Sequence, residues 1–220
     1  MAHSCERLLA TSKFALRCAA FLASIAIVIP QVAHAADPTQ PLAGERVLSF
    51  YMAGETDIVA VTNEGAKGFI EPFPSGIARF DEPALNTSIA MIVKLHDADG
   101  KTVGFASQME YFTGNADEVA TSWTVVIPGR GALYLTERER PDPRFHVDIV
   151  QKVFKTGTPW DGTFHRLATS GPRPDGRGEI SGGSMEFANA KGSFVEMHTY
   201  TRFTPDGKVG GNSELRIFLK

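Results

Sequence analysis

Beyond its first 35 residues the chain has no cysteine, because its two cysteines are Cys5 and Cys18. Their absence excludes disulfide bonds, thiolate metal sites and a cysteine nucleophile from residues 36–220. Basic residues are not in excess either, since 22 Lys and Arg stand against 25 Asp and Glu. With a formal net charge of -3 and no basic segment, the chain is not expected to bind nucleic acid.

Long apolar runs are also missing, and the apolar run at residues 19–29 is too short to span a bilayer. It follows Arg7, Lys13 and Arg17 and precedes the small-residue pattern Ala33-His34-Ala35. This order is typical of a signal peptide, so we predict cleavage near Ala35 and a secreted or periplasmic protein. An uncleaved membrane anchor is the alternative.

The remaining chain has the length of one domain. Residues 36–45 contain two prolines, and we expect them to form an extended, poorly ordered lead-in to a single domain at 46–220. This domain shows no long helical period. Residues 148–155 fit a short helix and a strand equally well.

Three pairs of apolar, β-rich runs flank turn sequences. Gly and Pro at such turns favour hairpins, because glycine accepts the positive φ that tight turns require. The paired runs are 88–96 with 101–112, 121–127 with 132–136, and 195–203 with 213–219. We therefore predict an all-β fold, an antiparallel closed β-barrel of about eight strands, since closure leaves no exposed edges. A β-sandwich is the alternative.

Residues 178–194 resemble a motif of the allene oxide cyclase and dirigent-protein barrels. The matching positions are Ile180, Gly182, Gly183, Ser184, Phe187, Ala190 and Gly192. We expect the paired glycines to turn the backbone at positive φ and Phe187 to close one end of the barrel. The position after Ser184 is often glycine in that family and is Met185 here.

The resemblance implies an eight-stranded barrel, often trimeric, that holds an apolar ligand. In that family the plant enzymes cyclise an unsaturated epoxide, and dirigent proteins steer the coupling of phenoxy radicals. This chain differs by a long insertion near residues 138–176.

Candidate catalytic residues lie on two predicted strands. Glu196, His198 and Arg202 share one strand face, where they would either act on a ligand oxygen inside the barrel or lie outside for solubility or a subunit contact. We favour the outer face. Glu110 shares a face with Gln108 and would act as an acid if buried, or else be solvated near the strand end.

Three further residues, Phe105, Met109 and Trp123, are predicted to line the ligand cavity. In the insertion, His146 and His165 lie near Trp160 and Phe164, and these residues would form a lid or fasten a long loop to the barrel. No histidine spacing indicates a metal site, and none is predicted.

The sequence thus predicts a secreted barrel that binds a small apolar or aromatic molecule, with cyclase-like, isomerase-like or stereo-directing chemistry that needs no cofactor. The alternative is a non-catalytic, homo-oligomeric barrel whose interior is filled by side chains. A membrane barrel is disfavoured by the charged strand faces.

Overall fold

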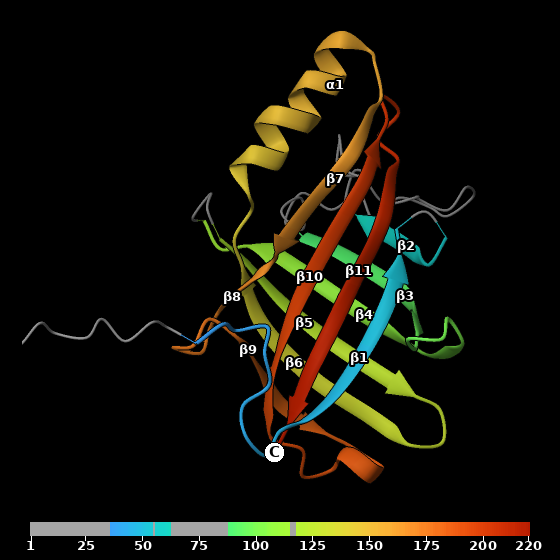
Figure 1. Cartoon of the computed structure of the whole chain (residues 1–220). Helices are drawn as coiled ribbons and strands as arrows, with labels where there is room; N and C mark the ends of the chain where they lie inside the picture. The colour runs from blue at the N-terminus through green and yellow to red at the C-terminus, as the bar shows by residue number, and fades with distance from the viewer. Residues whose placement is uncertain (1–35, 55, 63–87, 115–117) are drawn as a thin grey trace, which may run out of the picture. The chain divides into compact units, whose positions relative to one another are not determined.

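The computed structural model describes residues 36–54, 56–62, 88–114 and 118–220, and the predicted signal peptide lies outside them. Within these residues, no helix is both long and apolar enough to cross a membrane. The described chain is an antiparallel sheet with a short helical segment (Figure 1).

Eight strands close into a β-barrel in the order β1-β11-β10-β9-β6-β5-β4-β3, with β1 pairing to β3 through Tyr51 and His96. This confirms the predicted fold class. The barrel strands are β1 (Arg46–Ala53), β3 (Ser88–His96), β4 (Thr102–Phe112), β5 (Val119–Ile127), β6 (Gly131–Glu139), β9 (Gly178–Gly183), β10 (Gly192–Phe203) and β11 (Val209–Leu219). Strand β2 (Ile58–Thr62) pairs with the edge of β3 that faces away from β4.

The three predicted hairpins are present as β3–β4, β5–β6 and β10–β11, each antiparallel. Gly100 and Gly129 adopt φ of 79° and 80° in two of the connecting turns, as the turn chemistry requires. Strands β10 and β11 are the longest pair and run side by side with β1 (Figure 1).

The long insertion does not form a loose loop. It supplies a π-helical segment η2 (Phe145–Val150), the helix α1 (Gln151–Thr156), and two strands, β7 (Trp160–Leu167) and β8 (Thr169–Gly171). Residues 148–155 are therefore helical. Strand β7 pairs with the second half of β10, and β8 pairs with the end of β6.

Two apolar clusters stabilise these elements. The larger fills the barrel interior around Phe50, Leu95, Leu135 and Leu215. The smaller joins η2 and α1 to the β10–β11 hairpin through Phe145, Ile149, Val150, Val153, Phe203 and Val209. The helical segment is thus packed onto one end of the barrel.

At the glycine motif the backbone packs closely, as predicted, but the expected turn at positive φ is absent at the paired glycines. Neither Gly182 nor Gly183 has a positive φ. A Cβ on Gly183 would lie 2.3 Å from the carbonyl oxygen of Phe187, so this glycine is needed for close approach of the backbone. Phe187 itself is buried in the larger cluster and forms part of the short 3-10 segment η3 (Met185–Phe187).

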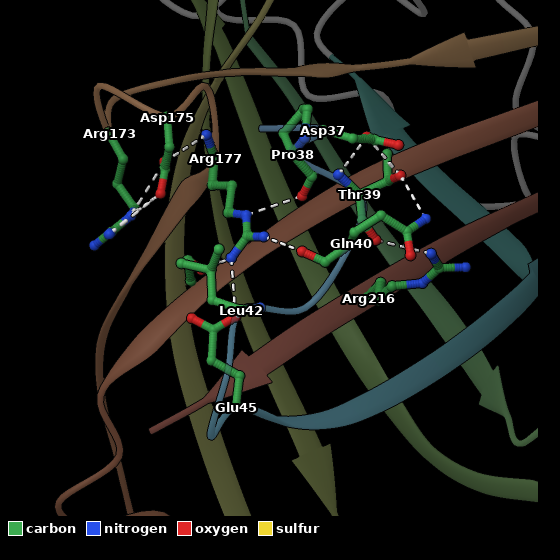
Figure 2. Close-up of polar contacts among 11 residues, drawn as sticks. Asp37, Pro38, Thr39, Gln40, Leu42, Glu45, Arg173, Asp175, Arg177 and Arg216 are labelled. Carbon is green, nitrogen blue, oxygen red and sulfur yellow. Dashed lines mark hydrogen bonds and ion pairs between the residues drawn. The ribbon is translucent and has the colours of Figure 1, made fainter. Parts of the chain in front are cut away.

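Residues 37–45 are anchored to the barrel, so the expectation of a poorly ordered lead-in is wrong (Figure 2). We call them the N-terminal strap. Arg177 donates to the carbonyl oxygen of Pro38 at 2.9 Å, to the carbonyl oxygen of Gln40 and to the carboxylate of Glu45 at 3.1 Å. Arg216 donates to the carbonyl oxygen of Thr39 at 3.0 Å.

Candidate functional site

A cavity of about 270 Å³ occupies the barrel end beneath η2. Its apolar wall comes from β1, β2, β3 and β5, with Met52, Ile58, Met91 and Trp123 among the lining side chains. Its polar wall comes from β6, β7, β10 and β11. In the closed strand order, β3 lies opposite β9. The neighbours of β9 are β10 and β6. The cavity therefore has an apolar wall and a polar wall, and Gln108 and Glu110 of β4 add polar groups between β3 and β5.

Strand β6 brings two carboxyl groups into the barrel, because Glu137 and Glu139 alternate with outward-facing residues. Glu137 accepts hydrogen bonds from the indole N–H of Trp123 at 2.8 Å and from the hydroxyl of Thr169 at 2.5 Å. Glu139 accepts from the hydroxyl of Thr121 at 2.6 Å. Both carboxyl groups are buried and hydrogen-bonded.

Strand β10 adds Glu196 and His198 to the same wall. Glu196 is 2% exposed, and its Oε1 lies 3.4 Å from Nε2 of His198. On the other side of the imidazole, Nδ1 lies 2.6 Å from the hydroxyl of Ser213 on β11. Within the described part of the chain, Oε2 of Glu196 has no hydrogen-bond partner.

From β7, Arg166 reaches the same cluster. Its Nη2 lies 3.5 Å from Oε2 of Glu139, and its guanidinium also hydrogen-bonds the hydroxyl of Tyr200. Its Nε is buried and unpaired among the described residues. A buried polar atom without a partner costs free energy, so these two unpaired atoms suggest a ligand contact.

Burial dominates the protonation of this wall. Burial, and after it the nearby carboxyl of Glu139, raise the pKa of Glu137 to about 8. Burial and the neighbouring carboxyl groups raise the pKa of Glu196 well above its ordinary value. Burial, together with Arg166, lowers the pKa of His198 to about 3. His198 is therefore a neutral imidazole near pH 7, and the protonated form of Glu196 is favoured.

Glu139, Glu196 and His198 each offer one ligand atom, and these atoms lie within 4.8 Å of one another. Two carboxylates and an imidazole are a set that could hold a divalent cation. Arg166 lies against Glu139 in this cluster and would repel such an ion. The arrangement fits proton transfer and hydrogen bonding to a ligand better than metal binding.

Our preference for the outer face of β10 is wrong for two residues, since Glu196 and His198 lie inside the barrel. Arg202 does lie outside, because a register shift between Tyr200 and Arg202 reverses the alternation of side chains. There it forms an ion pair with Asp161 at 2.7 Å. Glu110 is half-buried and lines the cavity.

Of the predicted cavity-lining residues, only Trp123 is inside. Phe105 and Met109 are 48% and 54% exposed and lie on the outer face of β4, so their assignment to the cavity is wrong. The inward face of β4 carries Ala106 and Gln108 instead. Apolar character misled the prediction, because β4 places Phe105 and Met109 outside and the polar Gln108 inside.

The insertion histidines have different positions. His146, on η2, lies at the rim of the cavity, whereas His165 is exposed and bonds to the hydroxyl of Thr199. The sequence analysis missed Glu137, Glu139 and Arg166. Alternation along β6 would have placed both glutamates on the face of Leu133 and Leu135, whereas nothing near Arg166 in the sequence indicates its position.

No protein-family model and no curated protein matches this chain. Among solved structures, the chain is similar to one described as a nonspecific heme-binding cyclase that catalyses a (4 + 2) cycloaddition during neoabyssomicin biosynthesis. The TM-score is 0.31 and the identity 9%, over 80% of this chain and 68% of that chain. A likeness this distant carries no argument about activity.

Proposed function

We propose that this protein binds a small apolar or aromatic compound in the barrel cavity and acts on it by acid–base chemistry, as a cofactor-independent isomerase or cyclase. The observation that carries this proposal is the buried acid Glu196, which lines a cavity of about 270 Å³ and has an oxygen with no hydrogen-bond partner among the described residues. A cavity with a few polar groups on one side is typical of small-molecule sites.

The chemistry follows from the protonation of the polar wall. Burial favours the protonated form of Glu196, which can donate a proton or hydrogen bond to a ligand oxygen, and neutral His198 adjoins it at 3.4 Å. The apolar wall excludes water and fixes the ligand's conformation, which favours an intramolecular reaction. The proposed site of action is the periplasm or the cell exterior, and the proposed relatives are the allene oxide cyclase and dirigent barrels.

Native mass spectrometry of the protein from its own host tests the proposal. We expect a small molecule to co-purify with the wild-type protein, and to be lost from Ile89→Trp, which places an indole in the cavity lining. The matched control is Ile92→Trp on the same strand, where the side chain faces outward. A ligand-free mass for the wild type, with no thermal shift across a panel of phenolics and fatty acids, would contradict the proposal.

A second function is favoured by the outer face of β3 and β4. Ile92, Phe105, Met109 and Tyr111 are all large, apolar or aromatic, and about half exposed. Exposed apolar patches of this kind often mark protein contacts. A homo-oligomeric barrel, trimeric by family resemblance, would cover this face. Sedimentation of the wild type against Met109→Lys would distinguish an oligomer from a monomer.

A further inference from the structure

Two polar atoms of cavity-lining residues have no hydrogen-bond partner in the described part of the chain, and they indicate what kind of ligand the cavity takes. Nε of Arg166 can only donate a hydrogen bond. Burial raises the pKa of Glu196 and so favours its protonated carboxyl, which can also donate, and Oε2 belongs to this group. Both residues line the cavity. The ligand group that satisfies two such donors is an oxygen acceptor.

The charge balance of the wall selects among acceptors. Among the described residues that line the cavity, the single guanidinium of Arg166 already faces the carboxyl group of Glu139, with 3.5 Å between Nη2 and Oε2. A ligand with a full negative charge would compete with Glu139 for this guanidinium and would lie beside a second buried carboxyl group, that of Glu196. A ligand cation would face the unpaired N–H of Arg166. A neutral oxygen that only polarises toward negative charge avoids both penalties.

Resting on the proposed function, we infer that the ligand is an apolar ketone or conjugated enone, whose carbonyl oxygen is held by Nε–H of Arg166 and the carboxyl of Glu196. Its hydrocarbon part lies against the apolar wall at Met52, Met91 and Trp123. Two donors on one carbonyl oxygen withdraw electron density from the conjugated system, which promotes enolisation and ring closure.

The inference is tested with four two-ring probes of similar size: α-tetralone, tetralin, the α-amine of tetralin, and α-naphthoate. Binding is measured by calorimetry. We expect α-tetralone to bind at least about tenfold more tightly than tetralin, because it gains hydrogen bonds from a charged and a neutral donor. The carbonyl-carbon NMR resonance of bound α-tetralone should move downfield.

Variants assign the advantage to the two residues. Arg166→Met and Glu196→Leu should each bring the affinity for α-tetralone close to that for tetralin, while tetralin binding itself is retained and shows that the cavity is intact. The control Arg202→Met removes an outward-facing guanidinium and should change neither affinity.

The outcomes separate the two proposals. If tetralin binds and α-tetralone binds no better, the ketone inference fails and the ligand-binding cavity stands. Tightest binding by the amine or by the carboxylate also overturns the inference. If none of the four probes binds, the proposed function fails together with the inference.

Discussion

Met185 adopts a φ of 52°, in the left-handed region that favours glycine, and its side chain is 70% exposed. Its position is the one at which the resembling family often has glycine. A non-glycine residue in this region costs about 1 kcal/mol, and an exposed methionine contributes little packing in return. The strain is therefore local and can be removed.

Met185→Gly should raise the free energy of unfolding by about 1 kcal/mol, measured by urea denaturation. Met185→Ala is the control, because alanine has the same backbone penalty and should give no gain. Equal stability of the glycine and alanine variants would show that the left-handed backbone is not the cause.

Single residues also show which structural features the sequence alone could not predict. Alternation correctly grouped Glu196 with His198, and Gln108 with Glu110, on shared strand faces. It could not say which face of each strand is inside. On β4 the outer face carries Phe105 and Met109, so hydrophobicity pointed the wrong way. Only the closure of the whole sheet decides such cases.

Among the elements, the hairpins were predictable because their turns are local in sequence, whereas the N-terminal strap was not. The strap depends on Arg177, which lies 132 residues from its ion-pair partner Glu45. Arg177 is 2% exposed, and its guanidinium also lies 4.1 Å from the ring centroid of Phe218 (Figure 2 shows its polar contacts). The buried cation Arg177, together with the Arg216 contact to Thr39, thus fixes the strap to the barrel.

Arg177→Met should destabilise the fold by about 3–5 kcal/mol, because it leaves the buried carboxylate of Glu45 without its partner. Thermal unfolding followed by circular dichroism would measure the loss. Arg173→Met, on the same loop, removes a more exposed ion pair with Asp175 and should cost less than about 1 kcal/mol.

The double variant Arg177→Met, Glu45→Leu separates charge burial from packing. Removing both charges should recover much of the stability lost in Arg177→Met, since no uncompensated carboxylate remains. If the double variant is as unstable as the single one, the hydrogen bonds from Arg177 to the strap carbonyls hold the segment instead.

At the scale of the whole molecule, the barrel interior is divided between a solid apolar core and a cavity with an acidic wall. The buried carboxyl groups make the stability of the whole fold depend on pH. The pKa of Glu137 rises from 4.5 to about 8 on folding, through burial and then through Glu139. Between these two pH values the native state therefore holds a proton that the unfolded state has lost. The stability that this proton contributes is fully present below pH 4.5 and declines as the pH rises through 8.

His198 acts in the opposite direction, and at lower pH. Its pKa falls from 6.5 to about 3, so the stability it contributes is present above pH 6.5 and is lost only as pH falls. Of the residues discussed here, only the buried carboxyl groups should make the free energy of unfolding change with pH between pH 6.5 and 8. Glu137 faces Glu139 and Glu196 there, and both of these also have raised pKa values, chiefly because of burial.

In that interval each carboxyl group that stays protonated only in the native state lowers the free energy of unfolding by about 1.4 kcal/mol per pH unit. Glu137→Gln keeps the shape but cannot ionise, so its stability should fall less steeply with pH than that of the wild type. Urea denaturation at several pH values measures both slopes, with exposed Glu179→Gln as the control. Parallel slopes for Glu137→Gln and the wild type would mean that Glu137 is already ionised in the folded barrel. The proton would then reside on Glu196 or Glu139, and the same titration applied to Glu196→Gln would locate it.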